Sequence, residues 1–243
     1  GLIPLISKAT SISSITPDDF SGYVYALLSC FHYKARFSEE LKTPGPRVPI
    51  TRDPALWARA VTLGKKLLWL HTYTERLRAP AEGRGDTLPT VPGLKWTTPV
   101  TRMPEKLTNI KYDPANQTLM VGNGTVSGVR QDVMDFSVSG MKVVSKWLGY
   151  RTAKGAGKAA SSSNPLDKIR LTEWPEEWSR ELIELLTVLT ITLDMQPELA
   201  TLLDAICDGP LISASELPKP TVAERKEPKV AKRASGPSLF DEE

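Results

Sequence analysis

Histidine and cysteine are scarce in this sequence, with two of each among 243 residues. Cys30 and Cys207 are far apart and match no zinc-binding spacing, so we expect two free thiols buried in the core of a protein from a reducing cytoplasm. His32 and His71 lie in helical patterns without a nucleophile or an orienting acid at a recognisable spacing. These scarcities argue against a metal cluster and a disulfide scaffold, and they favour structural roles for both histidines.

Long apolar runs are also missing. The longest, residues 182–193, is interrupted by Glu184 and by several threonines, whereas a bilayer-spanning helix needs about 20 apolar residues. No secretory signal is recognisable, and the chain begins at Gly1, as expected for a piece of a longer protein or for a processed chain. We therefore expect a cytoplasmic protein that does not associate with a membrane. Apolar residues still make up 40% of the chain, enough for one large domain or two small ones.

Motifs for catalysis and for cofactor binding are absent as well. Gly122-Asn123-Gly124 is not followed by a helical pattern, so it is expected to be a turn and not a dinucleotide-binding loop. Residues 164–167, Asn-Pro-Leu-Asp, lack the aromatic residue that amino-methylating enzymes place after the prolines to stack on a flipped base. We expect no catalytic centre and no bound cofactor in this chain.

Helical periodicity is present near both ends of the sequence. Asp18 and Asp19 offer an N-cap for one helix, and Asp53 followed by Pro54 begins another, because proline suits the first helical position. Pro175 introduces a third helix. The expected helices span residues 19–37, 53–78, 176–193 and 197–207, with a short one at 143–148.

Alternation of apolar and polar residues predicts a small sheet in the middle of the chain. Residues 110–112 and 118–121 alternate on either side of a turn at 114–116, which is a hairpin signature. Residues 134–138 alternate too, and Gly140 ends that strand. The predicted fold class is therefore α+β, with helices at both ends around a small, mostly antiparallel sheet.

The composition divides the chain into three segments. Residues 1–17 are rich in Ser and Thr and are expected to be a lead-in linker, followed by one domain over 18–215. Residues 216–243 have almost no core-forming side chains, which predicts a disordered tail. Within the domain, 79–99 is expected to be a long loop. Its Trp96 stands apart from the tryptophans on helix stripes and is a candidate base-stacking platform.

The net charge of +3 hides a strong local asymmetry. Residues 21–80 contain ten Lys/Arg and four Asp/Glu, and residues 140–170 contain seven Lys/Arg and one Asp, whereas residues 171–210 contain one Arg and nine Asp/Glu. Such a separation is expected of a protein with one nucleic-acid-binding face, although solvated helix faces also carry charge.

Five basic residues are candidate DNA contacts. Arg151, Lys154 and Lys158 lie among Gly, Ala and Ser, where backbone amides and lysines can approach phosphates closely. Arg47 lies between prolines that hold it extended, which suits a fixed contact either with DNA or with an acid on a neighbouring helix. Arg36 is either a further DNA contact or a helix-capping or packing arginine.

Four stretches together resemble the carboxy-terminal specificity domain of Type ISP restriction-modification enzymes, in the form found in actinobacterial methyltransferases. The resemblance covers roughly residues 18–210. Each stretch is short, and their order and spacing carry the resemblance. The stretches are Tyr23-Val24-Tyr25-Ala26-Leu27-Leu28 with Tyr33-Lys34-Ala35-Arg36-Phe37, then Pro46-Arg47-Val48-Pro49-Ile50, then Gly64-Lys65-Lys66-Leu67-Leu68-Trp69-Leu70-His71, and finally Phe136-Ser137-Val138-Ser139-Gly140 with Trp147 and Tyr150-Arg151.

The resemblance implies a module that selects a sequence in duplex DNA for a restriction-modification enzyme. In such systems a neighbouring methyltransferase domain binds S-adenosylmethionine and methylates the amino group of a flipped adenine. Phosphate contacts would hold the register, and loop side chains would read base edges in the major groove. The alternative is a scaffold or coupler that docks the methyltransferase domain to other domains or subunits, a role that suits the acidic segment 171–210 and its amphipathic helix.

Overall fold

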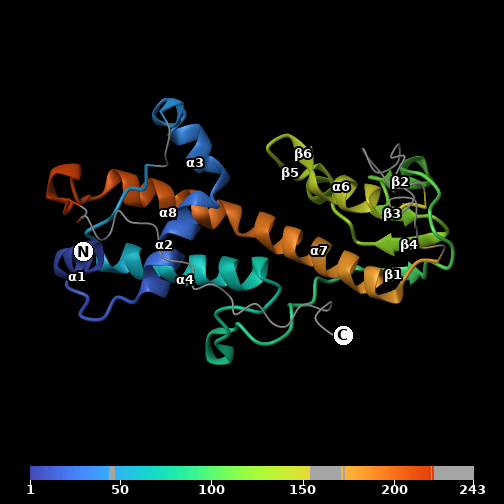
Figure 1. Ribbon diagram of the computed structural model, residues 1–243, viewed down its shortest axis with the longest axis horizontal. Coiled ribbons are helices and arrows are strands. Elements are labelled where there is room, and N and C mark those ends of the chain that lie inside the picture. Colours follow the sequence, from blue (N-terminus) through green and yellow to red (C-terminus); the bar gives the residue numbers. More distant parts are fainter. Residues whose placement is uncertain (44–46, 154–170, 172, 220, 222–243) are drawn as a thin grey trace, which may run out of the picture.

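A computed structural model describes residues 1–43, 47–153, 171, 173–219 and 221 (Figure 1). It confirms the predicted α+β class, with helices toward both ends and small antiparallel sheets between them. The helices are α1 (Leu2–Thr10), α2 (Pro17–Leu28), α3 (Phe31–Arg36), α4 (Pro54–His71), α5 (Gln131–Asp135), α6 (Val143–Gly149), α7 (Glu176–Asp194) and α8 (Gln196–Asp208). The strands are β1 (Lys95–Thr98), β2 (Ile110–Asp113), β3 (Thr118–Val121), β4 (Gly124–Ser127), β5 (Ser137–Val138) and β6 (Met141–Lys142).

Helices α1 to α4 and α8 surround one hydrophobic core, which we call the helical lobe (Figure 1). Its centre is the contact between α2 and α4, where Tyr23 stacks on Trp57 with ring centroids 4.3 Å apart. The two helices meet backbone to backbone, because a Cβ added to Gly64 would lie 1.7 Å from the carbonyl oxygen of Gly22. Glycine at position 64 is what allows so close a crossing, while a Cβ at Gly22 would meet its nearest atoms at 3.1 Å.

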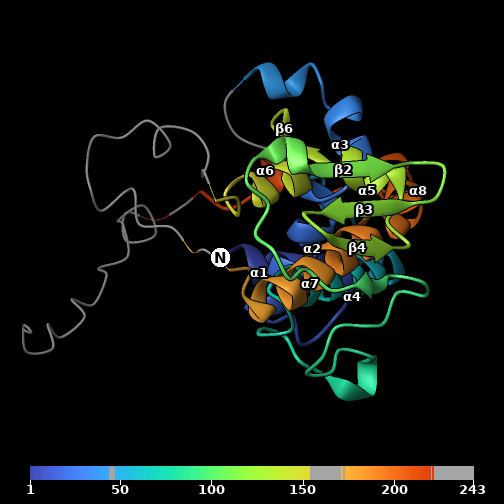
Figure 2. The ribbon, with the colours of Figure 1, turned by 90° about the vertical axis from the view of Figure 1, so that its right-hand side faces the viewer.

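A second core lies under the four-stranded sheet, and we call this part, residues 94–153 with the first half of α7, the sheet lobe. The strand order is β1-β4-β3-β2, with every neighbouring pair antiparallel. Strand alternation turns Leu119, Val121 and Val126 inward, where they are fully buried. Figure 2 shows the sheet covering one end of α7.

Helix α7 joins the two lobes. Leu182 and Leu186, in its first half, belong to the core of the sheet lobe, and Ile191 packs against the core of the helical lobe. Between them Val188 packs with Trp69 of α4. Figure 1 shows α7 running from the sheet to α8. One continuous helix therefore couples the two cores.

Two predicted helices are shorter in the structure than in the sequence prediction. The helix expected over 19–37 is broken at Ser29 and Cys30 into α2 and α3. The helix expected to reach residue 78 ends at His71, because Tyr73 and Thr74 adopt left-handed φ values of 50° and 67°. The Thr74 hydroxyl then donates to the carbonyl of Asp86 at 2.8 Å, which fixes the turn.

In the middle of the chain, the structure confirms one predicted hairpin and differs from the other predicted elements. β2 and β3 pair from Ile110 to Val121 as predicted. The strand expected over 134–138 is wrong, because its first half is helix α5 and only Ser137 and Val138 form a strand. Strand β1 lies inside the loop predicted for 79–99. Trp96 on β1 packs against the sheet-lobe core and donates from Nε1 to the carbonyl of Ser179 at 3.0 Å, so it is not an open stacking platform.

Ordered structure extends beyond both predicted ends of the domain. The lead-in predicted for 1–17 contains helix α1, whose Ile6 is completely buried in the helical lobe. Glu216, which the sequence prediction placed in the tail, pairs with Arg52 and closes a short turn with Ser213. Apolar residues spaced along a helix explain the first correction, and a long-range ion pair explains the second. Residues 222–243 of the predicted tail lie outside the described residues.

Candidate nucleic-acid interface

Arg36, a predicted DNA contact, is held by two carboxylates of α8. Its guanidinium donates to Asp204 at 2.7 Å and to Asp208 at 2.6 Å. The hydrogen bond to Asp208 is the main reason that the pKa of Arg36 is raised. The arginine joins α3 to α8, which is the packing role that the sequence left open for it.

Other cations of the helical lobe are paired in the same way. Arg59 lies 3.1 Å from Glu198, and Lys65 pairs with Asp19. The acids of α8 thus neutralise bases of α3 and α4. The sequence prediction took the separation of basic 21–80 from acidic 171–210 as the mark of one nucleic-acid face. In the structure several of these basic and acidic residues pair with one another, because folding brings α8 against α3 and α4.

Arg151 is clamped between aromatic rings in the sheet lobe. Its guanidinium carbon lies 3.7 Å from the ring centroid of Trp147 and 5.2 Å from that of Trp178, within cation–π range. It also donates to Glu181 at 2.9 Å. These contacts join α6 to α7. Lys154 and Lys158, the other cations of the predicted basic loop, lie outside the described residues.

Arg47 lies in the extended connector before α4, and its residue is exposed. The Tyr33 hydroxyl donates to the carbonyl of Arg47 at 2.6 Å and lies 3.0 Å from the Arg47 N–H. The Tyr23 hydroxyl donates to the carbonyl of Pro49 at 2.7 Å. Two tyrosines from α2 and α3 therefore hold the connector in place. The structure keeps Arg47 and Arg36 in the helical lobe and Arg151 in the sheet lobe, so it does not gather the three into one site.

The outer face of the four-stranded sheet carries basic side chains that sequence reasoning missed. Lys111 on β2 and Lys95 on β1 point away from the core; Lys111 is in register with Met120 and Thr125, and Lys95 is opposite Ser127. Alternation within each strand was the signal that could have found this face. Arg102 and Lys106, in the loop between β1 and β2, are exposed as well. None of the four cations has an ion pair within the part of the chain that the structure describes.

A second exposed surface is formed by the hairpin β5–β6 and helix α6. Lys142, Lys146 and Tyr150 are spaced four residues apart and so share one side of the helix. The Lys146 ammonium lies 4.9 Å from the ring centroid of Tyr150. Val138 and Met141, at the end of the hairpin, are 53% and 47% exposed. Sequence reasoning predicted part of this strand but assigned no role to it.

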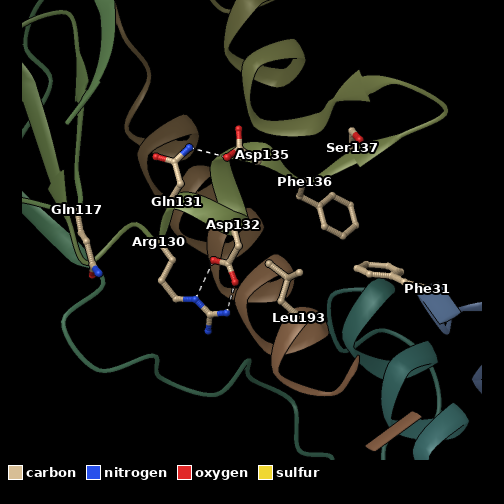
Figure 3. Close-up of a pocket in the computed structure, with 9 residues that line it drawn as sticks. All are labelled: Phe31, Gln117, Arg130, Gln131, Asp132, Asp135, Phe136, Ser137 and Leu193. Carbon is tan, nitrogen blue, oxygen red and sulfur yellow. Dashed lines mark hydrogen bonds and ion pairs between the residues drawn. The ribbon is translucent and has the colours of Figure 1, made fainter. Parts of the chain in front are cut away.

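A cleft of about 760 Å³ lies between the base of this hairpin and the helical lobe (Figure 3). Its apolar wall includes Phe136 and Phe31, whose ring centroids are 5.8 Å apart. The polar side chains that line the cleft form ion pairs and hydrogen bonds with one another. Arg130 bonds to Asp132 and lowers the pKa of that carboxyl, and hydrogen bonds from Gln131 and Lys142 do the same for Asp135. These carboxylates are therefore ionised partners of neighbouring donors and are poorly suited to act as general acids or bases.

His71 has a structural role, as the sequence predicted. The Thr192 hydroxyl donates to the carbonyl of Val188, so it accepts from His71 Nε2 at 2.8 Å. Nδ1 then accepts from the Tyr25 hydroxyl at 2.7 Å. Burial lowers the pKa of the imidazole, which keeps it neutral. The ring joins α2, α4 and α7.

The described residues contain no cluster of three or more His, Cys, Asp or Glu that could hold a metal ion. Cys30 and Cys207 are free thiols, the first buried and the second half-buried, and burial raises the pKa of both. Within the same described segments, no helix has the length and apolar character needed to span a bilayer.

A family model of the Type ISP C-terminal specificity domain matches residues 2–185 of this chain. The chain belongs to this family. Among solved structures, its fold is similar to that in a cryoEM structure of a DrdV–DNA complex, with a TM-score of 0.55 and 18% sequence identity. That alignment covers 82% of this chain and 19% of the other, so the chain spans a small part of its structural neighbour. No curated protein matches the sequence.

The Type ISP match places both exposed surfaces inside the specificity domain. It includes the outer face of the sheet and the hairpin with α6, and it ends within α7. Helix α8, whose acids pair with Arg36 and Arg59, lies beyond the matched residues. The surfaces with exposed cations are therefore part of the region that defines the family.

Proposed function

We propose that this chain is the DNA target-recognition module of a restriction-modification enzyme. The observation that carries the proposal is its membership of the Type ISP C-terminal specificity domain family. The similar fold in the DrdV–DNA complex supports it, because that structure contains DNA. A specificity domain has to bind duplex DNA through phosphate contacts and discriminate sequences through base contacts.

The charge of the sheet lobe supports DNA binding at that lobe. Lys95, Arg102, Lys106 and Lys111 are exposed and form no ion pair among the described residues, so their charges are available to phosphates. In the helical lobe, by contrast, Arg36 and several other cations already have carboxylate partners. We assign the phosphate contacts to the outer face of the sheet and to the loop that precedes β2.

The proposal extends to the catalytic part of the enzyme, which lies outside this chain. We propose that a neighbouring methyltransferase domain binds S-adenosylmethionine and methylates the amino group of adenine, and that the system acts in the cytoplasm. This chain would supply recognition and no catalytic centre. Calorimetric titration of the chain with S-adenosylmethionine should give no heat of binding, and micromolar binding would contradict this division of labour.

The coupler alternative loses the observations that favoured it. The acidic residues of α8 are used within the chain, as Asp204 and Glu198 pair with Arg36 and Arg59. The apolar face of α7 is also used, because Leu182 and Leu186 are completely buried in the sheet lobe. The acids of α8 and the buried face of α7 are thus engaged within the chain, which favours recognition over coupling.

The test is a salt series with a non-specific duplex and two variants of equal charge change. Replacing Lys95, Lys106 and Lys111 by Ala should weaken binding to all sequences and flatten the slope of log affinity against log salt by roughly 2–3. The matched control replaces three exposed lysines of the helical lobe, Lys8, Lys34 and Lys66, by Ala.

The control variant should retain most of the slope. Equal losses in both variants would show attraction by net charge alone and would contradict a DNA face on the sheet lobe. Absence of duplex binding by the wild-type chain at low salt would contradict the proposed function itself.

A further inference from the structure

The hairpin β5–β6 has apolar side chains in an unusual place. Val138 and Met141 are direct cross-strand partners, so their side chains lie on the same face of a two-stranded ribbon. They are 53% and 47% exposed, so about half of each residue is open to solvent. An exposed apolar pair at the end of a projecting element is a candidate contact with another molecule.

The hairpin is anchored at its base and open at its tip. The Val143 N–H donates to the carbonyl of Phe136 at 3.1 Å, and Lys142 pairs with Asp135 at 2.7 Å. Phe136 points from the base of the hairpin toward Phe31 across the cleft (Figure 3). Gly140, in contrast, would have no atom within 4 Å of an added Cβ. An isolated two-stranded ribbon is marginally stable, so these anchors give the projection its fixed direction.

The turn at the tip is tight and has two residues. Ser139 and Gly140 have φ values of 51° and 79°, which is the left-handed conformation needed at both positions of the tightest hairpin turn. Because Val138 and Met141 flank this turn, their side chains and the Ser139 hydroxyl are at the leading end. The tip therefore presents two apolar groups and one hydroxyl that can donate or accept.

The dimensions of the ribbon match the major groove of DNA. The three residues from Phe136, at the bonded base of the ribbon, to Val138, before the turn, extend roughly 10 Å at about 3.3 Å per residue. The major groove is about 8.5 Å deep and about 12 Å wide, and it admits a two-stranded ribbon. The tip can thus reach base edges while the base of the hairpin remains at the phosphates.

The flank of the ribbon carries the charge that DNA requires. Lys146 and Tyr150 follow the ribbon along one side of α6, and Tyr150 is 58% exposed, whereas Lys142 is paired with Asp135. Lysines and tyrosine hydroxyls are common phosphate contacts. The carboxylates nearest the base, Asp132 and Asp135, are paired with Arg130 and Lys142, which reduces their repulsion of phosphate. Charge therefore favours DNA over an apolar protein partner for this surface.

We propose that the hairpin β5–β6 enters the major groove of duplex DNA, that Val138 and Met141 contact a thymine methyl group, and that Lys146 and Tyr150 contact the flanking phosphates. The proposal rests on the proposed function and names the element that reads the sequence. Apolar contact with the C5-methyl group distinguishes thymine from the other bases in the major groove. The recognised sequence should therefore contain at least one A·T pair at the position of the hairpin.

The test uses the full chain and a pool of duplexes with a randomised core, with sequencing of the bound fraction. The wild-type chain should enrich a motif, and the double variant Val138→Ala, Met141→Ala should lose the preference at one A·T position while it still binds the pool. Leu41→Ala is the matched control, because Leu41 is a 37% exposed apolar residue of the helical lobe, away from both proposed DNA surfaces, and should leave the motif unchanged. Thermal melting checks that all chains are folded.

A chemical change in the DNA sharpens the assignment. Replacing the contacted thymine by uracil removes one methyl group and should weaken wild-type binding roughly fourfold. The double variant should bind both duplexes equally. Lys146→Ala should weaken all duplexes by the same factor and keep the motif.

Each other outcome overturns a specific statement. The same motif and the same uracil penalty in the double variant would overturn the hairpin assignment alone. Loss of all binding to the pool in that folded variant would make the hairpin an anchor that does not read bases. If the wild-type chain enriches no motif, the proposed recognition function fails and the hairpin assignment fails with it.

Discussion

The helix contacts of the helical lobe and the outer face of the four-stranded sheet use their charged residues in opposite ways. In the helical lobe, Arg36, Arg59 and Lys65 form ion pairs with carboxylates of the same lobe. On the outer face of the sheet, Lys95 and Lys111 have no such partners among the described residues. Similar numbers of basic residues in a sequence can therefore serve packing or binding. What decides between the two is whether the fold brings acids within reach.

The lobes also differ in how their parts approach one another. α2 and α4 touch at backbone distance through Gly22 and Gly64, whereas α6 and α7 are held apart by the large side chains around Arg151. The first arrangement tolerates no added atom. The second depends on one cation between rings. Three predictions test this comparison.

Gly64→Ala should have the largest effect. The added Cβ would meet backbone atoms of Gly22, which cannot rotate away, so the free energy of unfolding should fall by about 3 kcal/mol or more. Both lobes should unfold together at lower temperature, because α7 has side chains in both cores. Circular dichroism and tryptophan fluorescence during heating measure this.

Gly85→Ala is the matched control, since nothing lies within 4 Å of a Cβ there. Its free energy of unfolding should stay within about 0.5 kcal/mol of the wild type. Equal effects at the two glycines would contradict the close helix crossing.

Arg151→Ala should have an intermediate effect, a loss of about 2 kcal/mol, because it removes the contacts with Trp147, Trp178 and Glu181. Arg151→Lys keeps the charge but not the planar stacking group, so it should also lower the melting temperature. Urea unfolding of both variants measures the loss.

DNA binding by the same two variants separates structure from recognition. If Arg151 serves the clamp, the salt dependence of duplex binding stays unchanged in the folded variants. A slope that flattens by about 1 in Arg151→Ala and not in Arg151→Lys would instead support the phosphate contact that the sequence predicted.

His71→Gln should have the smallest effect, and a pH-dependent one. Burial lowers the pKa of His71, so below its ordinary pKa of about 6.5 the unfolded chain binds a proton that the folded chain resists. The stability contributed by neutral His71 is therefore complete above that pH and falls as the pH drops through it. At pH 8 the variant should lose about 1 kcal/mol, and the difference from wild type should shrink toward pH 5.5.

His32→Gln serves as the control, because His32 is exposed. Its difference from wild type should not follow the same trend. A constant difference between His71→Gln and wild type over this pH range would contradict a neutral, buried His71.

Local signals predicted most of the elements correctly. Pro54 after Asp53 begins α4, and the Asp53 carboxylate accepts from the backbone of Ala55 as a cap should. Alternation at 110–121 produced the hairpin β2–β3. The predictions failed where the decisive contact was distant or the element short. The short α1 has helically spaced apolar residues that the Ser/Thr content of 1–17 obscured, and the turn after His71 depends on a bond between Thr74 and Asp86.

The candidate site was harder to predict than the fold. Basic residues were visible in the sequence, but their partners were not. Arg36 pairs with Asp204 and Asp208, which are about 170 positions away in the chain. Arg151 contacts Glu181 and Trp178 on another helix. The outward direction of Lys95 and Lys111 likewise depends on which face of the sheet the core covers.

The sequence by itself determined the α+β class, most helices and the resemblance to the Type ISP specificity domain, because these follow from caps, periodicity and short motifs that act within a few residues. Only the tertiary structure decided which cations remain exposed and that Val138 and Met141 project on a ribbon. The physical reason is that ion pairing and burial depend on distances in space between residues far apart in the chain. Such distances are fixed only when the chain folds.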